Sequence, residues 1–68
     1  MATSLKNEIV VQINELFHQA EEAKNIYNWN NAIQDLENAK KICLEHNLKE
    51  SEGEIYYKLG EIYHIASQ

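Results

Sequence analysis

Two glutamate–histidine pairs are the residues of this chain whose types and spacing come closest to known chemistry. Glu15 precedes His18 by three residues, and Glu61 precedes His64 by the same interval. Di-iron four-helix bundles use this spacing twice, on helices whose side chains point into a shared core. Such a site also needs a glutamate from each of two further helices, and Glu15 and His18 lie off the apolar stripe of their predicted helix. We therefore expect both pairs on solvated helical surfaces, with no metal and no cofactor.

The single cysteine gives no better basis for catalysis. Cys43 lies on an apolar helical stripe, and no histidine follows it on the same face at a distance suited to a catalytic pair. Buried cysteines usually act as small packing residues. A lone cysteine rules out an internal disulfide and fits a reducing compartment. Because the sequence also has no glycine-rich loop, we expect that the protein is not an enzyme.

The composition favours a small all-helical protein. The chain has 68 residues, no proline and two glycines, so few residues interrupt helices. Its net charge is −5 and its six basic residues are all lysine, which argues against nucleic-acid and anionic-membrane binding. No apolar run approaches a membrane span, and residues 1–14 lack the pattern of a signal peptide. These features predict a cytoplasmic protein.

Three amphipathic helices would position the residues above, in an all-α antiparallel three-helix unit that forms one domain over residues 1–68. The helices are expected at about residues 5–26, 29–46 and 50–67. Polar and left-handed residues mark their ends: Thr3 or Ser4 as the first N-cap, Asn28 or Asn30 as the second, Asn47 with Leu48 in a Schellman closure, and Ser51 with Glu54 as a capping box. The third helix is expected to continue to the last residue.

The second helix organises the predicted core. Ala32 and Ala39 lie seven residues apart on its apolar stripe, between the larger Trp29 and Leu36. Small side chains at these places let a neighbouring backbone come close. The partner stripes are Leu5, Ile9, Ile13, Leu16, Phe17, Ala20 and Ala23 on the first helix, and Ile55, Tyr56, Leu59, Ile62, Tyr63 and Ala66 on the third. Packing would thus account for two of the three tyrosines of the third helix and leave Tyr57 exposed.

These stripes resemble the tetratricopeptide repeat, an antiparallel helix pair. Residues 29–39 are similar to its second helix, and residues 56–63 are similar to the first-helix signature of a following repeat, with Gly60 as the small residue. Leu16, Ala20 and Ala23 are a weaker version of that signature. Ala20 and Gly60 are forty residues apart, as in the longer subclass of the repeat. The resemblance implies a right-handed stack of helix pairs whose first helices line a concave peptide-binding groove.

The resemblance also implies which residues line that groove. They are Asn14, Phe17, Glu21 and Lys24 on the first helix, and Glu54, Tyr57, Glu61 and His64 on the third. An acidic and aromatic groove suits a protein segment that carries Lys or Arg beside an apolar anchor. The expected function is therefore a protein–protein interaction module or scaffold.

Two alternatives remain open. The three-helix MIT domain, which binds the tails of membrane-remodelling filaments, has a similar size and first turn, although residues 56–63 lack the polar stripe of its third helix. The other alternative is a structural unit that associates with itself, as a homodimer or other homo-oligomer. Its contact residues would be the apolar side chains left over by the helix pair: Ile9, Val10, Val11, Tyr56 and Tyr63.

Overall fold

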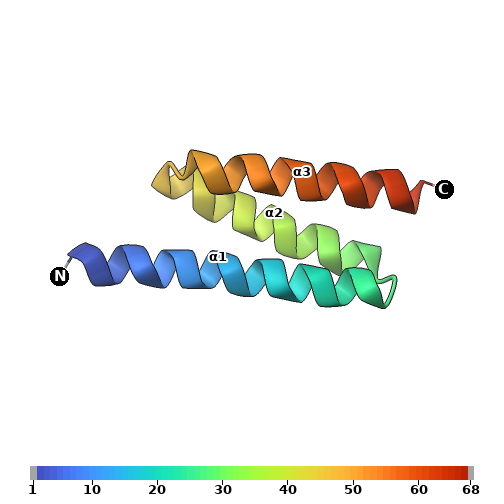
Figure 1. Cartoon of the computed structure of the whole chain (residues 1–68), viewed down its shortest axis with the longest axis horizontal. Coiled ribbons are helices and arrows are strands. Elements are labelled where there is room, and N and C mark those ends of the chain that lie inside the picture. The colour runs from blue at the N-terminus through green and yellow to red at the C-terminus, as the bar shows by residue number, and fades with distance from the viewer. Residues whose placement is uncertain (1, 68) are drawn as a thin grey trace.

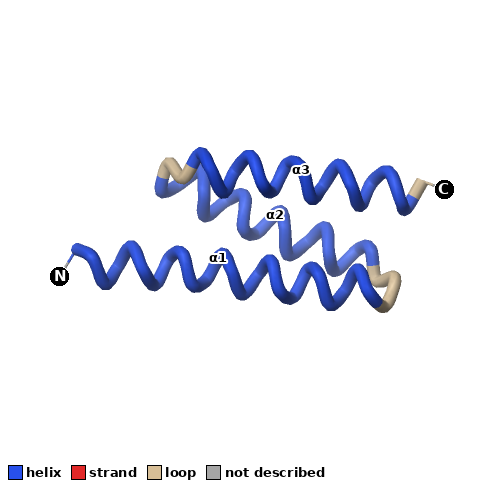
Figure 2. Tube along the Cα trace, in the orientation of Figure 1, coloured by secondary structure: helices blue, strands red, loops and turns tan. Residues whose placement is uncertain are grey.

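Three helices joined by two short turns make up the structure. The computed structural model describes the backbone of residues 2–67 and the side chains of residues 7–67. The helices are α1 (Ala2–Asn25), α2 (Trp29–His46) and α3 (Lys49–Ala66), and the described residues contain no strand. The expected all-α fold is confirmed. In Figure 1, α1 and α3 run in the same direction and α2 runs back between them, and Figure 2 shows how short the two turns are.

The core follows the predicted alanine-containing stripe of α2. Ala32, Leu36, Ala39 and Cys43 are fully buried, and α2 packs against both of its neighbours. The other helices contribute the remaining buried residues, Ile13, Ala20 and Ala23 from α1 and Ile55, Leu59 and Ile62 from α3. Larger side chains close the edges of this core: Ile9, Leu16, Phe17, Trp29, Ile33, Ile42 and Leu48. The result is an elongated, flat molecule of 46 × 19 × 13 Å.

The turn between α1 and α2 has the hydrogen bonds of a Schellman motif. The amide of Asn28 donates to the carbonyl of Ala23 at 2.8 Å, and the amide of Tyr27 donates to that of Lys24 at 3.0 Å. Tyr27 is left-handed, with φ 61°, at a position that glycine usually occupies. Asn28 is also the N-cap of α2, as expected, because its side chain accepts a hydrogen bond from the amide of Asn31.

The turn between α2 and α3 is built in the same way. Asn47 is left-handed, with φ 58°, and the amide of Leu48 donates to the carbonyl of Cys43 at 2.9 Å. The predicted Schellman closure is therefore confirmed. In both turns the left-handed residue, Tyr27 or Asn47, is followed directly by the residue at the N-cap position of the next helix, Asn28 or Leu48.

The expected capping box of α3 is wrong. The helix begins at Lys49 with Leu48 as its N-cap, and no side chain caps it. Ser51 and Glu54 consequently lie inside the helix. The Schellman turn at the end of α2 leads directly into α3 at Leu48. The side chain of Leu48 packs against the core and has no polar atom that could cap the helix. At the other end α3 stops at Ala66, with Ser67 as its C-cap, and Gln68 lies outside the described residues.

The expected start of α1 is also wrong. The helix begins at Ala2, so Thr3 and Ser4 belong to it instead of capping it. The first amides of a helix have no partner within the helix and can bond to water, so extending a helix by a few residues at this end costs little. The side chain of Leu5, expected on the apolar stripe, lies outside the described side chains.

Candidate interaction surfaces

A lysine joins α1 to α3 on one face of the molecule. The Nζ atom of Lys24 lies 3.0 Å from Oε1 of Glu21 and 3.1 Å from Oε1 of Glu61. The hydrogen bond to Glu21, followed by that to Glu61, raises the pKa of Lys24, although partial burial opposes the rise. Three of the eight residues expected to line the groove are thus brought together, across a sequence separation of 37 residues.

A second contact between α1 and α3 involves Phe17. Its ring is partly buried against the core, and Nζ of Lys58 lies 5.4 Å from the ring centroid, within the range of a cation–π contact. Tyr57, which directly precedes Lys58 on α3, is 74% exposed. The other expected groove residues, Asn14, Glu54 and His64, are exposed on the same two helices. We call the surface of these eight residues the α1–α3 face.

The charges of this face partly offset each other. Glu21 and Glu61 share Lys24, and Lys58 lies over Phe17. Lys24 therefore offsets part of the charge of Glu21 and Glu61, and Lys58 adds a second ammonium group to a surface that the sequence suggested would be acidic. Glu54 is exposed one turn before Lys58. The face is consequently amphipathic and mixed in charge, with Tyr57 as its most exposed aromatic side chain.

A different surface lies where α3 adjoins α2. Tyr56 and Tyr63 are 53% and 52% exposed, so the expectation that packing within the chain accounts for them is wrong. The pKa of Lys40 on α2 is raised mainly by its hydrogen bond to Glu37, and the phenol groups of Tyr56 and Tyr63 also raise it. We call this surface the α2–α3 face; by helical spacing it comprises Lys40 and Leu44, one turn apart on α2, and Gly53, Tyr56, Gly60 and Tyr63 on α3.

The remaining residues expected to mediate self-association lie on α1. Ile9 is half-buried against the core, whereas Val10 and Val11 are exposed. Val11 borders a shallow hollow of about 330 Å³ on the outer side of α1, together with Glu15 and His18. Tyr56 and Tyr63 face the α2 side of α3 instead. The five expected residues therefore occupy two separate surfaces.

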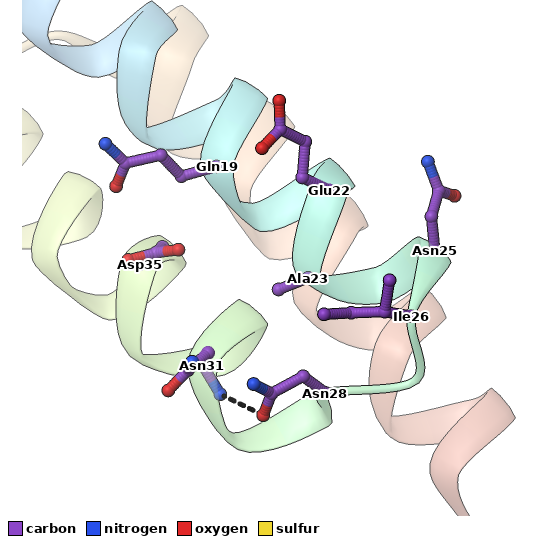
Figure 3. A pocket seen from close by; sticks show the side chains of 8 residues that line it. All are labelled: Gln19, Glu22, Ala23, Asn25, Ile26, Asn28, Asn31 and Asp35. Atoms are coloured by element: carbon purple, nitrogen blue, oxygen red, sulfur yellow. Dashed lines mark hydrogen bonds between the residues drawn. The ribbon is translucent and has the colours of Figure 1, made fainter.

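A polar hollow at the first turn was not anticipated from the sequence. Side chains of α1, α2 and the turn between them surround about 740 Å³ of open space, lined by Gln19, Glu22, Ala23, Asn25, Ile26, Asn28, Asn31 and Asp35. Figure 3 shows Gln19 extending toward Asp35, while Glu22 and Asn25 project from the rim. Polar side chains at every third position from Gln19 to Asn31, across the end of α1 and the start of α2, are the signal that could have revealed it. Asn28 at this site already serves as the N-cap of α2.

The glutamate–histidine pairs lie on two different helices with separate partners. Nε2 of His18 is 2.8 Å from Glu22, and Glu61 binds Lys24. Among the residues that the structure describes, no three His, Cys, Asp or Glu side chains come together as metal ligands would. Cys43 is buried, and burial, with a smaller contribution from Glu52, raises the pKa of its thiol. A raised thiol pKa makes the nucleophilic thiolate scarcer at neutral pH.

Comparison of the chain with protein-family models, curated proteins and solved structures gave no match. The resemblance to the tetratricopeptide repeat therefore rests on the residues of the chain itself. Within residues 2–67, no helix has the length and apolar character needed to cross a membrane.

Proposed function

We propose that this protein is a helical protein-interaction module that binds a partner segment through the α1–α3 face. The main observation behind this proposal is the ion pair between Nζ of Lys24 on α1 and Oε1 of Glu61 on α3, at 3.1 Å. This ion pair supports a surface shared by two parallel helices. Such a surface can accept an extended or helical segment lengthwise. The resemblance of residues 56–63 to a repeat signature points to the same class of function, and the proposal assigns the protein no catalytic role.

The composition of the face suggests the chemistry of the partner. Tyr57 offers a large, exposed aromatic surface, the kind of residue that often contributes most to binding. Glu54 is exposed nearby, and the whole chain has a net charge of −5. A segment with Lys or Arg beside one aromatic or aliphatic anchor fits this arrangement, because charge attraction would speed its association.

The proposal can be tested with ¹⁵N-labelled protein and two short peptides. One peptide carries Lys and Arg on both sides of a Trp, and the other carries Glu at the same positions. We expect the basic peptide to shift amide resonances of α1 and α3 around Phe17 and Tyr57, and the acidic peptide to bind at least about tenfold more weakly. Equal binding of both peptides, or shifts confined to other surfaces, would refute the proposal.

A pair of adjacent tyrosines provides the matched control. Tyr57→Ala should weaken the basic peptide about tenfold or more, whereas Tyr56→Ala should not, because Tyr56 lies on the α2–α3 face. Both side chains are more than half exposed, so both variants should keep the helical circular dichroism spectrum.

Self-association is a second candidate function, and the exposure of Tyr56 and Tyr63 favours it. Large apolar side chains that adjoin one another on a small protein commonly mark an interaction site. A homodimer formed through the α2–α3 face would leave the α1–α3 face open, so the two candidate functions are compatible.

A further inference from the structure

Along the α2 side of α3, small and large residues alternate on a single stripe. Gly53, Tyr56, Gly60 and Tyr63 follow one another at intervals of three, four and three residues. This is the spacing that keeps side chains on the contact side of a helix in a helix pair. An added Cβ atom at Gly53 or Gly60 would meet nothing within 4 Å. The stripe therefore presents two aromatic knobs and two open gaps.

The stripe is its own complement when the direction of the helix is reversed. Residues 53 and 63 lie equally far from position 58, and so do residues 56 and 60. Two antiparallel copies of α3 related by a two-fold axis at this level place each tyrosine opposite a glycine. A parallel pair in register would instead place tyrosine on tyrosine and glycine on glycine.

We infer that α3 packs antiparallel against α3 of a second copy of this chain, about a two-fold axis level with residue 58, with each tyrosine over a glycine of the other copy. The inference rests on the self-association proposed above and goes beyond it by assigning the face, the direction and the register. Two-fold contacts of this kind use the same surface on both copies.

The structure provides a hollow where this register requires one. Lys49, Glu52, Gly53 and Tyr56 surround an open space of about 270 Å³. In the antiparallel pair, Tyr63 of the second copy comes to lie over Gly53. Its ring would then be near the Lys49 ammonium group, which favours an aromatic face, and its hydroxyl near Glu52, which can accept a hydrogen bond.

The charges at the two ends of α3 also favour the antiparallel direction. The first turn contains Glu50 and Glu52, and the last turn contains His64. Antiparallel packing keeps the acidic first turns of the two helices apart, whereas parallel packing would bring them together. The helix dipoles reinforce the same preference.

The expected contact is modest in size. One 18-residue helix with its flanking residues, including the 57% exposed Leu44, gives a surface near the lower end of specific interfaces, about 1,200 Å² in total. The dimer should therefore be weak, and sedimentation equilibrium should extend from about 5 to about 500 μM. We expect a mass that rises from monomer to dimer over this range.

Complementary substitutions test the register directly. Tyr56→Ala removes a knob and Gly60→Tyr fills a gap, so each variant alone should raise the dimer Kd at least about tenfold. In an equimolar mixture of the two, the tyrosine introduced at position 60 of one copy would face the alanine introduced at position 56 of the other, and dimers should reappear as mixed dimers. Val11→Ala, on the outer side of α1, should leave the Kd unchanged. Circular dichroism confirms that each variant is folded, and a glycine with open space at its Cβ tolerates the added side chain.

Each result has a defined meaning. A wild-type monomer at the highest concentration overturns both this inference and the self-association candidate, while the peptide titration still decides the proposed binding function. If the wild-type protein dimerises and neither Tyr56→Ala nor Gly60→Tyr weakens the dimer, the face and register assigned here are wrong. The same conclusion follows if mixing the two variants fails to restore association.

Discussion

Replacing Ala39 by leucine probes the close packing of α2 in the core. Ala39 is 0% exposed, although its side chain is a single methyl group. A methyl group can be covered completely only when atoms of a neighbouring helix lie directly against it. Ala39→Leu therefore adds three carbon atoms at a place where the packing leaves them little room.

Two opposing free energies decide the sign of the effect. If space were available, burying the added carbons would stabilise the protein by roughly 2 kcal/mol, at about 0.8 kcal/mol for each methylene. In a tight contact, overpacking costs about 1–3 kcal/mol. Helix propensity hardly contributes, because alanine and leucine rank close together. The close packing at Ala39 predicts the second outcome, a net destabilisation of about 1–3 kcal/mol.

Thermal and urea unfolding followed by circular dichroism at 222 nm measure this effect. For a domain of this size, each kcal/mol lowers the Tm by about 4–8 °C, so we expect a fall of roughly 5–20 °C. Ala66→Leu is the matched control, because Ala66 is exposed near the end of α3, and its effect should stay within about 0.5 kcal/mol. An Ala39→Leu protein as stable as the wild type would show that the helices are not in close contact there.

Two further predictions concern Cys43 and Asn47. Because burial raises the pKa of the Cys43 thiol above its ordinary value of 9.0, the folded protein keeps a proton that the unfolded chain loses, and stability should fall as the pH rises above this value, by at most about 1.4 kcal/mol per pH unit. Urea unfolding between pH 7 and 10.5 should show a flatter profile for Cys43→Ala, and parallel profiles would contradict the assignment. Asn47→Ala should lower the free energy of unfolding by about 1 kcal/mol, because Asn47 is left-handed with φ 58°, whereas Asn47→Gly should not lower it. An equal loss in both variants would point to the asparagine side chain instead of the backbone.

Features governed by periodicity and local backbone chemistry could be predicted from the sequence. The stripe of α2 was correct because residues three and four apart share a helical face whatever surrounds them. Asn47 was correctly placed at the end of α2, because asparagine tolerates the left-handed conformation. Tyr27 adopts the same conformation without any such signal. Its ring packs edge-on to that of Trp29, with the ring centroids 5.8 Å apart, a contact between two particular side chains that single-residue propensities do not contain.

Features that depend on how the helices approach one another could not be predicted. The capping box at Ser51 is a valid local pattern, but the preceding closure places the N-cap of α3 at Leu48, three residues earlier. The meeting of Lys24 with Glu61 requires knowing that α1 and α3 lie side by side there. Likewise, Tyr56 follows the apolar periodicity of α3, yet α2 covers only Ile55, Leu59 and Ile62, and Tyr56 falls beyond the edge of that contact.

The position of α3 links the two proposed surfaces. This helix buries three side chains against α2 and reaches α1 through Lys24 and Lys58. Most of the stability of a helix in a protein comes from the packing of its apolar face, so α3 depends on this limited packing to remain docked. Both proposed surfaces contain residues of α3 and exist only while it is docked. A ligand that binds only the docked state stabilises it by mass action. A peptide on the α1–α3 face and a second copy on the α2–α3 face would therefore favour the same state, and each would strengthen the binding of the other.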